Sequence, residues 1–162
     1  MKKQIGCVII ILNDQHQVLL VLRDQKSSIP FPNTWNLLGG FKEEEESPKD
    51  CIHRELLEEI EVDVGEVYFW RKYHWVDCDE YIFWQSLNFD LNQVKLNEGQ
   101  RLAYLSRSQI QQTQLAFECN QILEDFFQAE VRVANLDANF SSVRSSLSFG
   151  KIEDSLFLFN IL

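Results

Sequence analysis

Eight glutamates fall within the 24 residues from Gly39 to Val62, and two glycines open that segment. It reads GGFKEEEESPKDCIHRELLEEIEV. Acidic stretches usually form a solvated surface, but carboxylates gathered at one place can also bind Mg²⁺ or Mn²⁺, which prefer oxygen ligands. The spacing of these glutamates within the predicted local structure decides between the two interpretations.

Residues 48–60 have the pattern of an amphipathic helix. Ser47 is a favourable N-cap, Pro48 suits the first helical position, and Asp50 completes a capping-box variant. At about 100° per residue, four apolar side chains fall on one side of this helix and can pack on a sheet. These side chains are Ile52, Leu56, Leu57 and Ile60.

Three carboxylates of the same helix occupy a separate arc. Glu55, Glu58 and Glu59 are spaced i, i+3 and i+4, and like charges at this spacing destabilise an isolated helix by about 0.2–0.5 kcal/mol per pair. Arg54, four residues before Glu58, relieves only part of the repulsion. One bound divalent cation would remove it, so the spacing favours a metal site, whereas residues 43–45 are expected to be solvated.

Gly40, Glu46 and the run from Arg54 to Val62 extend this pattern. With five residues between the first two and seven between Glu46 and Arg54, the segment resembles the Nudix box, G-x5-E-x7-R-E-U-x-E-E-x-G-U, where U is apolar. Every defining position matches except Glu61, where the family has glycine. This MutT-like resemblance implies an α/β Nudix fold, a single domain with a mixed β-sheet sandwiched between α-helices.

The resemblance also implies a reaction. Nudix hydrolases cleave a pyrophosphate bond in a nucleoside diphosphate linked to another group, with Mg²⁺ or Mn²⁺ as the cofactor. The favoured substrate is a (d)NTP. The alternatives are a nucleotide sugar, ADP-ribose or a dinucleoside polyphosphate, or a non-catalytic module that binds a nucleotide and regulates a partner. The intact R-E-x-x-E-E core argues against the last alternative, because a mere binder could lose carboxylates that repel one another.

The box residues acquire roles through the same resemblance. Glu58 and Glu59 are the expected metal ligands, and Glu55 is a further ligand or a base that orients water. Arg54 is expected to position these carboxylates by ion pairing. Gly40 is expected to offer a backbone group to the metal.

Two glutamates outside the helix complete the expected site. Glu46 would orient the loop and the metal ligands without itself binding the metal. Glu98, in the stretch NEGQRLAYL, resembles a loop glutamate that reaches the metal in the MutT-like branch, as a general base or an additional ligand. An ordinary surface glutamate is the alternative for Glu98.

Candidates for contacts with the substrate are less specific. Arg23, at the end of the predicted second strand, is either a phosphate contact or a surface arginine. Trp35, just before the glycines, is the best-placed aromatic side chain for stacking on a base, and Tyr81 is another candidate. Most aromatic side chains in strands belong to the core instead.

Glu61 is the one departure from the box. The family glycine stands near the helix end, where a left-handed residue is common. Glutamate in that conformation costs about 1–2 kcal/mol. Two outcomes are therefore open: Glu61 adopts the strained conformation, or the helix continues and ends nearer Gly65.

The remaining elements follow from hydrophobic patterning. Residues 4–13 and 17–24 read as a strand pair, residues 25–36 as a loop, and residues 66–76 and 80–91 as a long hairpin. A short strand is predicted for residues 101–105, followed by two helical stretches within 106–128. Residues 1–128 are accordingly predicted to form the Nudix domain, and residues 129–162 a C-terminal extension.

The amino-acid composition of the chain limits the kinds of partner that it can bind. The chain has 162 residues, a normal size for one domain, with 15 basic and 25 acidic residues and a net charge of −10. Such a surface repels duplex nucleic acid and would accept a phosphorylated small molecule only with the help of cations. No apolar run approaches the roughly 18 residues of a membrane span. The four scattered cysteines suggest free thiols in a reducing cytoplasm, so a cytoplasmic protein that binds a nucleotide is expected.

The apolar end of the sequence, SLFLFNIL, generates a first prediction. An exposed apolar terminus favours aggregation, so this segment is expected to pack on the domain or to pair with another chain in a homodimer. If it forms a homodimer, deletion of residues 152–162 should halve the mass measured by light scattering. An unchanged mass with unharmed solubility would exclude that role.

Overall fold

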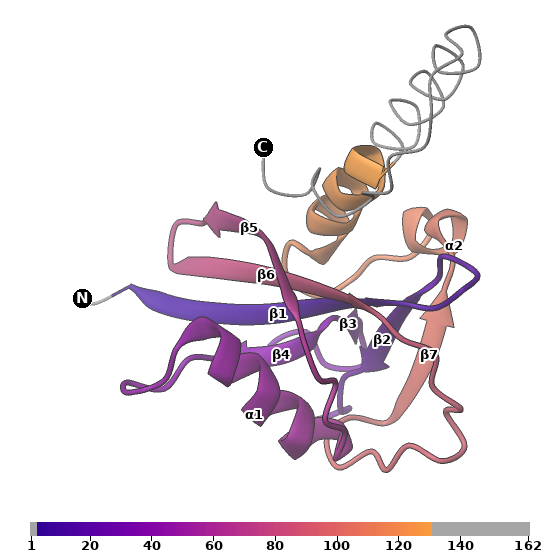
Figure 1. Ribbon diagram of the computed structural model, residues 1–162, viewed down its shortest axis with the longest axis horizontal. Helices are drawn as coiled ribbons and strands as arrows, with labels where there is room; N and C mark the ends of the chain where they lie inside the picture. Colours follow the sequence, from indigo (N-terminus) through magenta and orange to yellow (C-terminus); the bar gives the residue numbers. More distant parts are fainter. Residues whose placement is uncertain (1–2, 131–162) are drawn as a thin grey trace, which may run out of the picture. The chain divides into compact units, whose positions relative to one another are not determined.

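A mixed β-sheet forms the centre of the protein, seen here in a computed structural model that describes residues 3–130 (Figure 1). Its strands are β1 (Gln4–Leu12), β2 (Val18–Leu22), β3 (Trp35–Asn36), β4 (Leu38–Phe41), β5 (Tyr68–His74), β6 (Cys78–Ser86) and β7 (Arg101–Leu105). The helices are α1 (Pro48–Ile60) and α2 (Arg107–Gln111), and residues 119–130 are also helical. No helix within residues 3–130 is long and apolar enough to span a membrane.

Strand β1 is the central strand of the sheet. Along one edge it pairs in parallel with the whole of β6, from Gln4 opposite Cys78 to Leu12 opposite Ser86. Along the other edge it pairs antiparallel with β4 and then with β2. The order β3-β2-β1-β6-β5, with β7 beside β2, makes the sheet mixed, as the sequence predicted.

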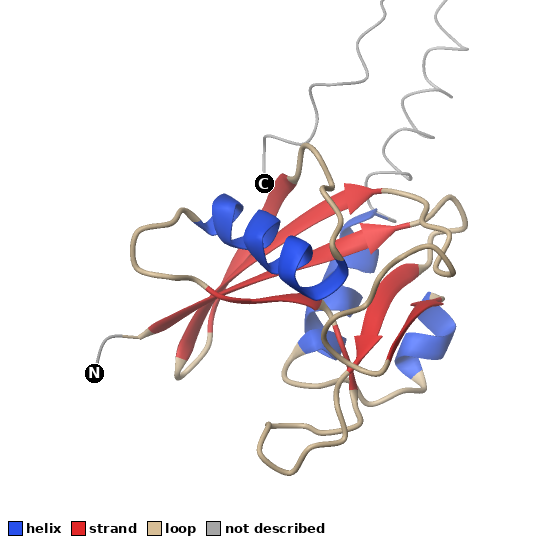
Figure 2. Cartoon of the chain, turned by 90° about the horizontal axis from the view of Figure 1, so that it is seen from below, coloured by secondary structure: helices blue, strands red, loops and turns tan. Residues whose placement is uncertain are grey.

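Both faces of the sheet are covered, which explains why β1 is an almost continuous apolar run. Its residues Cys7, Ile9 and Ile11 belong to a buried cluster that includes Leu56 and Ile60 of α1. The intervening residues of β1 point to the opposite face and are also buried. Figures 1 and 2 show α1 lying across one face of the sheet, and Figure 1 shows α2 on the other side.

Helix α1 begins as the sequence predicted. Ser47 is the N-cap, its hydroxyl accepts a hydrogen bond from the Asp50 amide, and the Asp50 carboxylate accepts one from the Ser47 amide. At the other end Glu61 is the C-cap in the left-handed conformation, with φ 53° and ψ 33°. The strained alternative is therefore the one adopted, and the helix does not continue toward Gly65.

The predicted loop of residues 25–36 ends earlier than expected, because its last two residues form β3, and strand β4, which was not predicted, follows at once. Gly39 and Gly40 lie in β4, paired with Val8 and Cys7 of β1. Gly39 has φ 130°, and a Cβ atom there would lie 2.1 Å from the carbonyl oxygen of Cys7. Glycine is thus required for β4 to lie beside β1. Trp35, assigned to the same loop, lies in β3.

The other predicted strands are confirmed, some of them with different bounds. The strand pairs β1–β2 and β5–β6 are antiparallel, as expected, and β7 matches the predicted short strand. Residues 87–91, predicted to extend the hairpin, are not part of a strand. All four cysteines are free.

The first compact unit of the chain is Met1–Glu124, and a second begins at Asp125. The predicted apolar terminus, residues 152–162, and most of the predicted C-terminal extension lie outside the described residues. The boundary at residue 128 therefore stays a prediction.

Candidate active site

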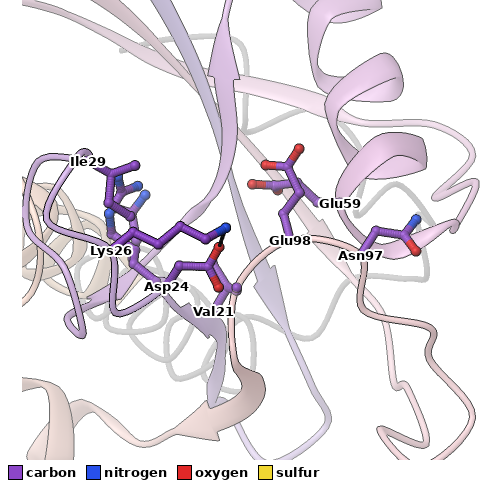
Figure 3. A pocket seen from close by; sticks show the side chains of 10 residues that line it. Val21, Asp24, Lys26, Ile29, Glu59, Asn97 and Glu98 are labelled. Carbon is purple, nitrogen blue, oxygen red and sulfur yellow. Dashed lines mark hydrogen bonds and ion pairs between the residues drawn. The ribbon is translucent and has the colours of Figure 1, made fainter.

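The predicted carboxylates come from two segments far apart in the sequence, α1 and the loop before β7. Glu55 and Glu59 project from α1, and Glu98 comes from the loop. Figure 3 shows the carboxylates of Glu59 and Glu98 next to each other at one side of a cavity, with Lys26 and Asp24 at the other.

Arg54 holds three of the carboxylates in place. Its Nε and Nη2 atoms donate to the two carboxylate oxygens of Glu46, at 3.0 and 2.8 Å. Its Nη1 atom lies 2.9 Å from Glu55 Oε1 and 3.0 Å from Glu58 Oε2, and Nη2 also donates to the carbonyl of Phe41. The hydrogen bonds from Arg54 lower the pKa of Glu46 to about 2, so Glu46 is ionised throughout the physiological range.

Glu59 has the least favourable environment for a negative charge. Its carboxylate is partly buried and accepts one hydrogen bond from the Gly39 amide, at 3.0 Å. Its pKa is raised to about 8, mainly by burial and also by the charges of Glu55 and Glu98, whereas the Gly39 hydrogen bond and the charge of Arg23 lower it. The environment of Glu59 in the metal-free protein therefore favours the protonated form of its carboxyl group.

Gly40 makes room for Glu55. A Cβ atom at Gly40 would lie 2.4 Å from Glu55 Oε1, so only glycine lets this carboxylate lie against the strand. Burial raises the pKa of Glu55, as do the charges of Glu58 and Glu98, whereas the hydrogen bond from Arg54 lowers it. The spacing of Gly40 and Glu55 in the sequence box thus has a steric reason.

Asn97 connects the loop before β7 to the end of α1 through hydrogen bonds. The sequence gave no reason to select this residue. Its backbone amide donates to the carbonyl of Glu59 at 2.8 Å, and its side-chain amide donates to the carbonyl of Glu58 at 3.0 Å. The side-chain amide also donates to the carboxylate of Glu61 at 3.1 Å. The next residue is Glu98.

A cavity of about 430 Å³ opens beside Glu59 and Glu98, within the range of small-molecule sites. It is lined by Val21, Arg23, Asp24, Lys26, Ile29, Asn36, Glu59, Asn97, Glu98 and Gly99. Asn36 is a buried polar residue and accepts a hydrogen bond from the Cys119 thiol at 3.2 Å. Sequence reasoning missed Asn36, Asp24, Lys26 and Ile29, since isolated residues of a loop and a short strand carry no recognisable pattern.

The structure places the three predicted substrate contacts differently. Arg23 lines the cavity, its Nε donating to the carbonyl of Pro30. Trp35 is not a lining residue, and the guanidinium of Arg101 lies 5.2 Å from its ring centre. Tyr81 packs against the buried cluster beneath α1 and is not a lining residue either.

The donor set is suited to a hard divalent cation. Glu55, Glu59 and Glu98 supply oxygen atoms, and burial, with a contribution from the neighbouring carboxylate charges, raises the pKa values of Glu55 and Glu59. A cation would stabilise the ionised forms that burial disfavours. Among residues 3–130, however, no three acidic, histidine or cysteine side chains already converge at ligand distances.

A comparison with family models decides the classification. The model of the NUDIX domain matches residues 2–126, most of the chain. The chain belongs to the Nudix family. Nudix hydrolases generally use divalent metal ions and act on pyrophosphate bonds, which agrees with a site built from carboxylates. No curated protein matches the chain significantly.

Solved structures of other proteins share the fold. The MutT protein from Methanosarcina mazei Go1 is 22% identical with a TM-score of 0.65, and the match covers 80% of this chain and 98% of that one. The NUDIX domain of Shewanella oneidensis NrtR, in complex with ADP ribose, is 20% identical with a TM-score of 0.65, over 82% and 90% of the two chains. The ORF135 protein of E. coli is 26% identical with a TM-score of 0.59, over 80% and 92%.

The two glycines of β4 allow a matched test of the Nudix site. Gly39→Ala should destabilise the fold by about 3 kcal/mol or more, because it combines a positive φ with a backbone clash. Gly40→Ala should change the free energy of unfolding little, because only the flexible Glu55 side chain must move. It should nevertheless weaken Mn²⁺ binding by roughly 10-fold. Denaturant unfolding and calorimetric titration with Mn²⁺ measure both effects, and equal metal affinity of Gly40→Ala and wild type would contradict the steric role.

The raised pKa of Glu59 predicts a pH effect in metal-free protein. The folded-state pKa, about 8, exceeds the ordinary value of 4.5, so Glu59 lowers the free energy of unfolding as pH rises from 4.5 to 8. Each unit of that difference corresponds to about 1.4 kcal/mol. Glu59→Gln should therefore be more stable than wild type at pH 8 in EDTA, with the gap closing toward pH 4.5. Glu58→Gln, which changes an exposed carboxylate, serves as the control. Parallel curves of stability against pH for Glu59→Gln and wild type would refute the raised pKa of Glu59.

Proposed function

We propose that this protein is a Mg²⁺- or Mn²⁺-dependent hydrolase that cleaves the pyrophosphate bond of a nucleoside diphosphate linked to another group, with a (d)NTP as substrate. The observation that carries the proposal is the position of Glu59 and Glu98 at the wall of a cavity that also contains Arg23 and Lys26. Carboxylates that repel one another beside cationic side chains suit a metal-bound polyphosphate.

The metal would be held by Glu55, Glu58, Glu59 and Glu98, with a backbone group of Gly40. When bound, the cation neutralises charge on the phosphoryl oxygens and lowers the pKa of a bound water. A protein of net charge −10 requires such a cation to accept a polyphosphate.

The chain's own residues supply the remaining functions. Arg54 keeps Glu55 and Glu58 oriented by ion pairs. Glu98 is the candidate general base. It would accept a proton from the attacking water while the oxygen of that water bonds to phosphorus and the bridging P–O bond breaks. Arg23 and Lys26 line the same cavity and are the candidate contacts to phosphate oxygens, although Lys26 also pairs with Asp24 at 2.6 Å.

The substrate test must distinguish several leaving groups. The NUDIX domain of NrtR was solved with ADP ribose, so ADP-ribose belongs in any substrate test beside (d)NTPs, oxidised dNTPs, nucleotide sugars and dinucleoside polyphosphates. Val21, Ile29 and the amide of Asn36 offer apolar and hydrogen-bonding contacts for a base in the cavity. Trp35 and Tyr81 do not line it, so they are not part of the proposed base site.

Incubation of the purified chain with Mg²⁺ or Mn²⁺ and this panel tests the proposal directly. A nucleoside monophosphate and pyrophosphate should form from a (d)NTP. Products from a diphosphate ester alone would retain the chemistry and change the substrate class. Tight nucleotide binding with no product in either metal would favour the non-catalytic module instead.

Glu58→Gln tests the metal role within the active protein. It should lower metal-dependent kcat by about 100-fold or more while the protein remains folded, because one ligand charge is lost. Glu45→Gln, which removes the same charge from an exposed site in the preceding loop, should leave kcat unchanged. Equal turnover of the Glu58→Gln and Glu45→Gln variants would eliminate Glu58 as a metal ligand.

A further inference from the structure

We infer that Glu61 and Asn97 are positioning residues that fasten the loop of residues 95–98 to the end of α1 and thereby hold Glu98 in the candidate site. The inference rests on the proposed function, in which Glu98 acts at that site. It assigns a purpose to Glu61, the one residue of the helix segment that departs from the family box.

Glu61 adopts a backbone conformation that glycine would adopt at lower free energy. Its φ of 53° and ψ of 33° are left-handed, and Cβ sterics disfavour this region for any residue with a side chain. A glutamate at such a position is therefore expected to have a side chain that does something glycine cannot.

The Glu61 side chain contacts the loop at two points. Its carboxylate forms an ion pair with Lys95 and accepts the hydrogen bond from the Asn97 side-chain amide. The ion pair is largely exposed, with 67% of the Lys95 side chain and 47% of the Glu61 side chain accessible, so it contributes little to global stability. Its effect is on the position of the loop.

Asn97 completes the attachment from the other side. The last carbonyl groups of a helix lack partners within the helix. Two of these carbonyls, those of Glu58 and Glu59, accept hydrogen bonds from the side chain and backbone of Asn97. The helix end that carries the predicted metal ligands is thus bonded directly to the residue before Glu98.

A second attachment fixes the loop on the far side of Glu98. The Gln100 amide donates to the carbonyl of Leu22 in β2 at 2.8 Å. Gly99, with φ 91°, allows this approach, because a Cβ there would lie 2.8 Å from the same carbonyl oxygen. Glu98 is therefore held between α1 and β2, and release of the α1 attachment should leave the loop folded but let Glu98 move.

Variants of Glu61 can separate an effect on the position of Glu98 from an effect on the stability of the fold. Glu61→Gly should leave the free energy of unfolding unchanged or raise it, because it relieves backbone strain. The same variant should lower kcat about 10-fold with little change in KM, because Glu98 is less well placed. Glu61→Gln keeps the acceptor for Asn97 and should retain at least half of kcat. Glu66→Gly, which removes another exposed ion pair, with Lys49, controls for the loss of a surface charge pair.

The experiment uses the full chain in five variants: Glu61→Gly, Glu61→Gln, Glu98→Gln, the double variant of Glu61→Gly with Glu98→Gln, and the control Glu66→Gly. Kinetics are measured on whichever panel substrate is hydrolysed, and amide hydrogen exchange of residues 95–99 is measured in metal-free protein. Glu61→Gly should increase exchange in this segment about 10-fold. In the Glu98→Gln background it should have no further effect on kcat, because Glu61 acts through Glu98.

Two results would overturn the inference: wild-type kcat and exchange in Glu61→Gly, or an equal loss of kcat in the wild-type and Glu98→Gln backgrounds. If no substrate is hydrolysed, the proposed function fails, and exchange together with Mn²⁺ affinity still decides the inference. Faster exchange and weaker Mn²⁺ binding in Glu61→Gly, but not in Glu66→Gly, would then support it.

Discussion

Like charges held close together are the constraint on which this structure depends. Glu55, Glu58 and Glu59 lie on one helix, and the charge of Glu98 reaches two of them. Arg54 supplies the compensating charge and, through its fork to Glu46, also connects α1 to the segment before it. The guanidinium geometry suits this role, because its planar fork binds one carboxylate with two nitrogens and still has a third for the helix.

The sheet provides the rigid surroundings that this charge arrangement needs. β4 lies beside β1 only because Gly39 has no side chain, and the Gly39 amide then donates to Glu59. Gly40, the next residue, leaves the space that Glu55 occupies. Two adjacent glycines therefore serve separate purposes, one for the backbone pairing and one for the carboxylate.

The sequence predicted the parts of the molecule that repeat a pattern. The capping box at Ser47, the alternating hairpins and most of the apolar face of α1 are local signals, and the structure confirms them. Leu57 was wrongly placed on that face, because it is 50% exposed. The strand at Gly39 and Gly40 was missed, because glycine lacks a side-chain pattern and the strand exists through pairing with β1. Asn36 and Asn97 were missed for a related reason: each acquires its role from a partner at least 36 residues away along the chain. Trp35 was selected for its place just before the glycines and Tyr81 for its aromatic side chain, and neither property determines whether a side chain lines a cavity.

The parallel pairing of β1 with β6 has a consequence for how the protein folds. The first strand of the chain meets its longest partner only after some 70 residues have intervened, from Gln4 opposite Cys78 to Leu12 opposite Ser86. Contacts so distant in sequence close a large loop and slow the folding reaction. Asn97 and Glu98 lie beyond β6, so the loop that bonds to the end of α1 follows the central pairing in chain order. A partly synthesised chain could form α1 and its capping box while the carboxylates of the helix still lack the neighbour supplied by the loop.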